Sequence, residues 1–379
     1  METYRYVAPC LFGIEGVAAD ELRRLGFSDV RAADGRVTFS GGLDALARAN
    51  LCSRYCERVI LEVTRFPATT FTQLFDGVKA APWAQFIPKD AAFPVDGYSV
   101  RSQLSSIPDC QKIVKKAIVT ALQTKYGIEW FSETGTMYRV RFSILKDEVS
   151  IGLDTSGEGL HKRGYREIGN IAPLRETLAC AMLDLAHYRG RDAFLDPFCG
   201  SGTIAIEAAL KASNHAPGLN RRFAAQSWAF VPEKVWVDAR TEALDSIYTG
   251  TYDIEARDID PACVELAKEN ARKAGVAEMV RFSIADAAKP FAFDGTIVTN
   301  PPYGERMGDL TQARRLYAAF GKAVDPRARV YVLSSDEDFE RYYGRRAAKK
   351  RKLYNGMIKC CLYMYFDEAD KSRPVRRKV

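Results

Sequence analysis

The stretch at residues 193–210, AFLDPFCGSGTIAIEAAL, constrains the fold more than any other part of the sequence. An apolar run ends at Asp196, Gly200 and Gly202 flank a serine in a tight turn, and helix-forming residues begin at Thr203. A strand, a glycine turn and a helix in this order form the first βα unit of a nucleotide-binding α/β sheet. The turn matches neither G-x-G-x-x-G nor the lysine-bearing phosphate loop, so we expect neither a dinucleotide nor an NTP phosphate there. A glycine turn with a purely structural role is the alternative.

A second motif follows the apolar strand end at residues 296–299, where the sequence reads Asn300-Pro301-Pro302-Tyr303. The two prolines donate no N–H groups and fix the backbone. The amide oxygen of Asn300 and the neighbouring carbonyls are therefore expected to accept hydrogen bonds from a ligand. Taken alone, this stretch also fits a proline-rich turn.

Together the two motifs resemble those of class I methyltransferases: Asp196 with its glycines resembles motif I, and N-P-P-Y resembles the motif of enzymes that methylate an exocyclic or amide nitrogen. The resemblance implies S-adenosylmethionine as cofactor and a Rossmann-like α/β sheet, mostly parallel and closed by an antiparallel hairpin. It implies cofactor-binding residues Asp196, Phe198, Gly200, Gly202, Thr203, Asp258, Asp286 and Asn300. The implied catalytic residues are Asn300, Pro301, Pro302 and Tyr303.

Two carboxylates in this set lie at predicted strand ends downstream of motif I. The resemblance gives Asp258 the ribose hydroxyls and Asp286 the adenine amino group. Either residue fits a helix cap as well. Asp260, which precedes Pro261, is predicted to cap the following helix.

The N-terminal part of the chain predicts two small α+β units before the catalytic domain. Residues 1–65 follow a β-α-β-β-α-β order, which is ferredoxin-like. Residues 66–160 resemble a THUMP domain, an RNA-binding module of RNA-modifying enzymes, and residues 161–379 form the predicted methyltransferase domain. At its end, Asn355-Gly356 between apolar runs predicts the closing hairpin.

Basic and aromatic residues in two segments are candidates for RNA contact. Lys112, Lys115 and Lys116 lie on a predicted helix at residues 108–126, and a solvated helix face is the alternative. Residues 214–228 resemble an insertion of the RlmL branch, the guanine-N2 methyltransferases of large-subunit ribosomal RNA. Within them, Arg221, Arg222 and Phe223 have the composition that contacts phosphates and unstacked bases, and a surface loop with a packed Trp228 is the alternative.

Composition narrows the class of protein further. The 379 residues include 55 Lys and Arg against 48 Asp and Glu, a net charge of +7 that is consistent with a polyanionic partner. Nine cysteines without a C-x-x-C motif and only three histidines predict a reduced, cytoplasmic protein without a metal site. No run reaches the length needed to cross a membrane.

The resemblance as a whole implies transfer of a methyl group to the exocyclic N2 of a guanosine in large-subunit (23S) ribosomal RNA, either free or in a precursor particle. One catalytic domain is expected, because neither motif occurs twice. The alternatives are a guanine-N2 tRNA methyltransferase, an adenine-N6 nucleic-acid methyltransferase and an inactive ribosome-assembly protein. The sequence predicts no oligomeric state.

Overall fold

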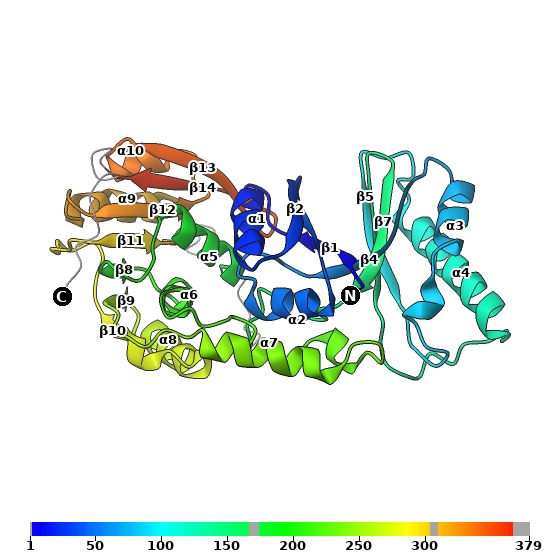
Figure 1. Ribbon diagram of the computed structural model, residues 1–379. Coiled ribbons are helices and arrows are strands. Elements are labelled where there is room, and N and C mark those ends of the chain that lie inside the picture. The colour runs from blue at the N-terminus through cyan, green and yellow to red at the C-terminus, as the bar shows by residue number, and fades with distance from the viewer. Residues whose placement is uncertain (1, 167–173, 304–309, 367–379) are drawn as a thin grey trace. The chain divides into compact units, whose positions relative to one another are not determined.

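The computed structural model describes residues 2–166, 174–303 and 310–366, which form two compact units (Figure 1). The first unit comprises Met1–Cys10, Ala19–Leu160 and Arg222–Thr241. The second comprises Leu11–Ala18, His161–Arg221 and Glu242–Val379. Each unit is built on one seven-stranded sheet.

The sheet of the first unit has the strand order β2-β3-β1-β4-β7-β6-β5. Its elements are β1 (Tyr4–Pro9), α1 (Glu15–Arg24), β2 (Ser28–Ala33), β3 (Arg36–Gly41), α2 (Leu43–Cys52), β4 (Ile60–Pro67), α3 (Phe71–Lys79), β5 (Val95–Val100), α4 (Ile107–Tyr126), β6 (Val140–Leu145) and β7 (Glu148–Asp154). The first six confirm the predicted β-α-β-β-α-β order. The turn between β6 and β7 has Lys146 and Asp147 both at positive φ.

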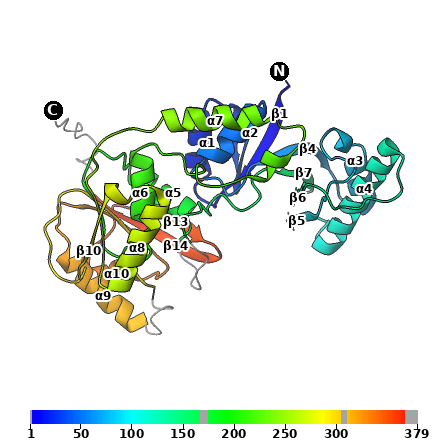
Figure 2. The ribbon, with the colours of Figure 1, turned by 90° about the horizontal axis from the view of Figure 1, so that it is seen from below.

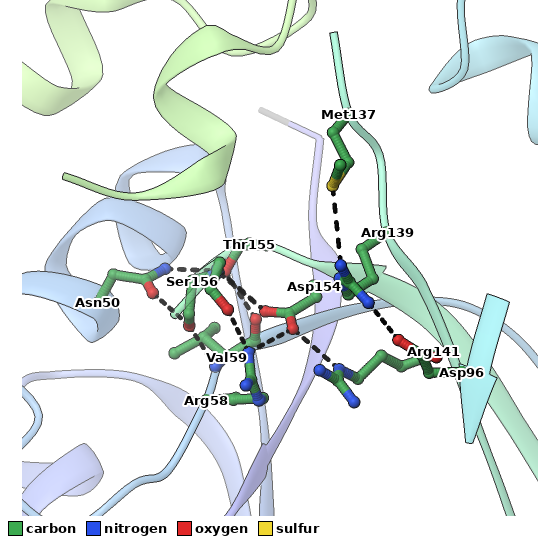
Figure 3. Close-up of polar contacts among 11 residues, drawn as sticks. Asn50, Arg58, Val59, Asp96, Met137, Arg139, Arg141, Asp154, Thr155 and Ser156 are labelled. Carbon is green, nitrogen blue, oxygen red and sulfur yellow. Dashed lines mark hydrogen bonds and ion pairs between the residues drawn. The ribbon is translucent and has the colours of Figure 1, made fainter. Parts of the chain in front are cut away.

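The two predicted N-terminal domains share this sheet, because β4 pairs with β1 on one side and with β7 on the other. A polar network holds the junction together (Figure 3). The fully buried Asp154 accepts hydrogen bonds from Arg58 Nη1 at 2.6 Å and Arg141 Nε at 2.9 Å. Asn50 bonds Thr155 and Ser156 at 2.8 and 2.6 Å. The predicted boundary at residue 65 falls inside β4, and the division into domains remains a prediction.

Residues 222–241 belong to the first unit, although they follow helices of the second unit in the sequence. They contain a short 3-10 helix (Ala224–Ser227) and the start of α7 (Glu233–Asp245), a helix that the sequence did not predict. Ala225 N donates to Thr155 O at 3.0 Å, and the buried ring of Trp228 stacks on Tyr138 with centroids 5.0 Å apart.

The sheet of the second unit has the order β10-β9-β8-β11-β12-β14-β13. Its elements are α5 (Glu176–Leu185), β8 (Phe194–Asp196), α6 (Thr203–Ala212), β9 (Ile254–Asp258), α8 (Pro261–Ala274), β10 (Val280–Ile284), β11 (Thr296–Thr299), α9 (Leu310–Ala323), β12 (Arg329–Ser334), α10 (Phe339–Tyr343), β13 (Lys349–Asn355) and β14 (Ile358–Tyr365). The sequence predicts a helix over residues 172–185 in place of α5, and residues 172 and 173 of that prediction lie outside the described residues. Strands β8 to β12 are parallel, and β14 and β13 add an antiparallel hairpin. The predicted Rossmann-like fold is confirmed.

The chain winds outward from β8 in both directions, and right-handed crossovers therefore place the helices on opposite faces of the sheet. Helices α5, α6 and α8 pack side by side, and α9 packs with α10 (Figure 2). Under α9 lies an aromatic cluster that includes Tyr317, Phe320, Phe339, Tyr343 and Tyr365. This cluster fixes α9 next to the ends of β11 and β12.

Candidate active site

The carboxyl ends of β8 and β11 meet at the centre of the second unit's sheet. Sequential strands depart from this point in opposite directions, and in open α/β sheets such a switch point is where ligands bind. Leu195 pairs with Ile297, so Asp196 and Thr299 lie one and two residues beyond this pair on neighbouring strands. Thr299 Oγ1 donates to Asp196 Oδ1 at 2.7 Å, so the two motifs found in the sequence share one site.

The glycine turn after β8 has the backbone that its sequence predicts. Gly200 has φ +50° and Gly202 φ +83°, in the left-handed region that favours glycine. A Cβ on Gly202 would lie 2.9 Å from that of Ala267 in α8, so this glycine permits close helix packing. A Cβ on Gly200 would meet no atom within 4 Å, so the turn opens to space that a ligand can enter.

Asp196 is a buried carboxylate whose two oxygens differ in their hydrogen bonding. It is 1% exposed. Oδ1 accepts from Thr299 and from Phe198 N at 3.3 Å, whereas Oδ2 has no hydrogen-bond partner among the described residues. Burial raises the pKa of Asp196 to about 7. A buried acceptor of this kind matches the cationic end of S-adenosylmethionine that the sequence resemblance assigns to it.

Asp258, at the end of β9, holds the glycine turn from the neighbouring strand. Its Oδ2 accepts from Gly200 N at 2.9 Å and its Oδ1 from Asp260 N at 3.1 Å. Asp260 accepts from Ala262 N at 2.9 Å, which confirms its predicted role as the cap of α8. Asp258 thus lies at the edge of the turn, where a ribose contact is expected.

Asp286 follows β10 at the same edge of the sheet. Its half-buried carboxylate accepts from Ala288 N at 2.9 Å, a local turn contact. Phe198 and Thr203 lie on either side of the glycine turn. The Phe198 ring packs edge-on against Phe320, with centroids 5.0 Å apart, and Thr203 is buried at the first position of α6.

The N-P-P-Y segment follows the end of β11, and two tyrosine hydroxyls hydrogen-bond its oxygen atoms. Tyr303, 9% exposed, donates its hydroxyl to Asn300 Oδ1. The acceptor expected to receive a substrate amine is thus held by a tyrosine in this conformation. Tyr317 Oη donates to Pro302 O at 2.8 Å and ties the diproline backbone to α9.

Sequence reasoning missed a buried charged network behind the glycine turn. Arg166 donates to Thr203 Oγ1 at 3.0 Å and pairs with Glu176 Oε1 at 2.7 Å. Glu207, fully buried on α6, accepts from Tyr165 at 3.0 Å and from Cys180 at 2.8 Å. The available signal was a single glutamate within the apolar run TIAIEAAL, because a buried carboxylate needs partners.

The predicted RNA-binding lysines of α4 differ in their surroundings. Lys112 and Lys116 are exposed. Lys115 donates to Phe93 O at 3.1 Å, pairs with Glu133 and lies 3.5 Å from the centre of the Phe93 ring. The structure therefore gives Lys115 an internal structural contact, in place of the phosphate contact expected from the sequence.

The three candidate RNA-binding residues at positions 221–223 also differ in their exposure and contacts. Arg222 is exposed, whereas Arg221 Nη1 donates to Lys162 O at 2.7 Å. Phe223 is 4% exposed and stacks on Trp236, with centroids 5.3 Å apart. A ring already packed on both the core and a tryptophan has no face left for a base, so we reassign Phe223 to packing.

In residues 2–166, 174–303 and 310–366, no helix has the length and apolar character to cross a membrane. The same residues contain no group of three or more His, Cys, Asp or Glu side chains arranged to hold a metal ion.

Models of three families match the chain. The RMKL-like methyltransferase domain matches residues 163–364, the RlmL ferredoxin-like domain residues 5–60, and the THUMP domain residues 68–154.

Among curated proteins, the chain is 46% identical to a Bacillus subtilis protein named "Putative RNA methyltransferase YpsC", over 100% of this chain and 99% of that one. It is 34% identical to the ribosomal RNA large subunit methyltransferase K/L of Syntrophotalea carbinolica, over 97% of this chain. The chain spans about half the length of that K/L enzyme, 54%.

Among solved structures, a possible methylase from Clostridium difficile 630 superposes with a TM-score of 0.92 at 40% identity, over 99% of this chain and all of that one. A predicted N6-adenine-specific DNA methylase from Listeria monocytogenes gives 0.90 at 46% identity, over 97% of both chains. SMU.472, whose structure is a complex with SAH, gives 0.88 at 38% identity, over 97% of this chain and 99% of that one.

Proposed function

Since the chain belongs to the RMKL-like methyltransferase family, we propose that it transfers a methyl group from S-adenosylmethionine to the exocyclic N2 of a guanosine in 23S ribosomal RNA. The observation that carries the proposal is the contact between Thr299 and Asp196, because it joins the glycine turn and the N-P-P-Y segment in one site. The match to a THUMP model and the names of the K/L relatives support RNA as the substrate.

The residues around the glycine turn fit the cofactor. Asp196 Oδ2 is a buried acceptor that no described residue hydrogen-bonds, Gly200 borders open space, and Asp258 lies at the edge of the same turn. We assign the cationic end of the cofactor to Asp196, the ribose to Asp258 and the adenine to Asp286. When bound, S-adenosylmethionine supplies an electrophilic methyl group on a sulfonium.

The chain's own contribution to the reaction is to hold a weak nucleophile. The lone pair of an exocyclic amine is delocalised into the ring, so the amine needs acceptors for its N–H groups and a fixed orientation. Asn300 Oδ1 is the acceptor, and the diproline backbone keeps it in place. Tyr303 donates to the same oxygen and helps to hold it in place, and an amide oxygen can accept a second hydrogen bond from the arriving amine.

The test is nucleoside mapping of 23S ribosomal RNA by mass spectrometry, with and without the gene. Loss of one N2-methylguanosine, restored by the wild-type gene and not by an Asn300→Ala gene, supports the proposal. An unchanged N2-methylguanosine content with loss of a different methylated nucleoside contradicts it. A cytoplasmic location and ribosomal RNA or a precursor particle as partner belong to the same proposal.

Methylation of adenine N6 is the second candidate, favoured by the name given to the Listeria monocytogenes structure. N-P-P-Y chemistry suits either amine, so the motif does not choose between them. The same mapping experiment decides: loss of N6-methyladenosine from RNA or DNA selects this candidate.

A further inference from the structure

The β13–β14 hairpin extends beyond the edge of the sheet that carries the active site. β12 ends at Ser334, which pairs with Cys361, and the hairpin continues past this pair through residues 353–360. Because β12 runs parallel to β8, β9 and β11, its end lies at the same edge as Asp196 and Asn300. The hairpin tip is therefore on the side from which a substrate approaches.

The hairpin tip is also connected to the glycine turn by a chain of contacts. Asn355 Oδ1 accepts from Arg175 N at 3.4 Å, and Arg175 is the N-cap of α5. The next residue, Glu176, pairs with Arg166, which donates to Thr203 at the start of α6. A molecule bound to the hairpin tip therefore lies close to the start of α5, which is linked through Arg166 to the start of α6 at the glycine turn.

The surface at this end of the hairpin, which we call the hairpin patch, comprises the exposed side chains of Phe12, Lys352 and Met357 and the half-buried ring of Tyr354. Phe12 is 57% exposed and Met357 99% exposed. The rings of Phe12 and Tyr354 meet edge to face with centroids 6.4 Å apart, and Lys352 Nζ lies 5.4 Å from the Tyr354 centroid.

The patch is held in place by the loop that carries Phe12. Arg351 Nη2 and Nε donate to Gly13 O at 2.6 and 3.2 Å. Gly13 has φ +93°, and a Cβ there would lie 2.9 Å from Lys352 O. Phe12 is therefore presented by a loop packed tightly on β13, so that little ordering is needed when a partner binds.

We propose that the hairpin patch binds nucleotides of the RNA substrate that flank the target base. The proposal rests on the proposed RNA methyltransferase function and names a surface that this function uses. Aromatic rings stack on unstacked bases of any sequence, and a lysine beside them contacts phosphate.

Charge selects RNA over a second copy of the chain as the occupant. Residues 345–352 read RRAAKKRK, six cations among eight residues without an acidic one. Lys350 and Lys359, on the same face as Tyr354, pair with Glu340 and Glu337, while Lys352 lies by the ring. β13 is the edge strand of its sheet, and a row of lysines on an edge strand opposes pairing with a like-charged copy.

The test compares the full-length wild type, Phe12→Ala, Phe12→Trp and Lys352→Gln for binding of an unmodified 23S ribosomal RNA transcript across a salt series. Tyr248→Ala is the matched control. Tyr248 is 61% exposed in the same unit, and its N–H bonds Ser213 O just after α6, at the opposite edge of the sheet. Cofactor affinity, measured by calorimetry, reports on folding of the unit.

Phe12→Ala is expected to weaken RNA binding about tenfold, with Phe12→Trp restoring it. Lys352→Gln is expected to reduce the salt slope by about one. Cofactor affinity should be unchanged in all variants, and Tyr248→Ala should bind RNA as the wild type does. RNA affinity unchanged by Phe12→Ala overturns the proposal, as does a wild-type dimer that this variant dissociates. If the wild type binds the RNA but methylates no guanosine, the proposed function is wrong. The effect of Phe12→Ala on RNA affinity still shows whether the hairpin patch binds RNA.

Discussion

Tyr317 donates its phenolic hydroxyl to the main-chain carbonyl of Pro302 across 2.8 Å. The tyrosine is fully buried on α9, within the aromatic cluster that packs against β11 and β12. The position of Asn300 therefore depends on a residue that lies outside the N-P-P-Y motif and is not expected to touch the substrate.

Tyr317→Phe should lower kcat about tenfold and leave the KM for S-adenosylmethionine unchanged. Removing the phenol leaves Pro302 O without this partner, at a cost of roughly 1–3 kcal/mol, and loosens the acceptor that orients the amine. Steady-state kinetics with RNA and cofactor varied separately measure both constants.

Tyr343→Phe is the matched control for this substitution. Tyr343 is buried in the same cluster, and its hydroxyl has no hydrogen-bond partner in the part of the chain that the structure describes. Its removal should leave kcat within about twofold of the wild type. Equal loss of kcat in the two variants would mean that general loosening of the cluster, and not the bond to Pro302, limits the reaction.

Cofactor affinity should rise with pH up to about pH 8 and then level off. Burial raises the pKa of Asp196 to about 7 in the free protein, and a cationic ligand favours the ionised form, so binding lowers that pKa. Below pH 7, Kd should therefore increase by up to about tenfold per unit of falling pH. Calorimetry from pH 5.5 to 8.5 tests this, with Asp196→Asn expected to bind more weakly and with a flat pH profile. A wild-type profile as flat as that of Asp196→Asn would contradict the role of Asp196.

The same residue predicts how the unliganded protein responds to pH. Its pKa is raised from 3.8 in the folded state, so the neutral form favours folding, and this contribution is lost as pH rises from about 4 through 7. As pH rises over this range, the free energy of unfolding of the wild type should fall relative to that of Asp196→Asn. Denaturant unfolding without cofactor measures it.

Two lysines of α4 should contribute to RNA binding, and a third should contribute to folding. Lys112 and Lys116 are exposed, so replacing both with Gln should weaken RNA binding and flatten its salt slope by up to about two. Lys115→Met should instead lower the stability of the first unit, because Glu133 and Phe93 O lose their partner. RNA titrations at several salt concentrations and thermal unfolding separate the two effects, and a Lys115→Met variant with wild-type stability would refute the second.

Local backbone chemistry explains why much of the site could be predicted from the sequence. Gly200 and Gly202 need positive φ, Pro301 and Pro302 fix their own backbone, and Asp260 caps the helix that follows it. Asn355-Gly356 likewise determines its own hairpin turn. Each of these signals comes from residues next to one another in the chain.

The other residues depend on partners that are distant in sequence. Lys115 has the pattern of a solvated helix residue, and only the fold brings Glu133 to it. Phe223 could stack on a base or on Trp236, and burial decides between them. Tyr317 is one aromatic residue on an amphipathic helix, and its bond to Pro302 exists because α9 packs over the end of β11. Spacing alone predicts none of these contacts.

Asn300 is expected to present a guanine amine to the cofactor held at Asp196. The most direct measurement is incubation of purified protein with methyl-labelled S-adenosylmethionine and unmodified 23S ribosomal RNA, followed by nucleoside analysis. We predict label in N2-methylguanosine, with turnover reduced about a hundredfold or more in Asn300→Ala while RNA affinity stays near that of the wild type. Label confined to another nucleoside would contradict guanine N2 as the target, and full turnover by Asn300→Ala would contradict the role of Asn300.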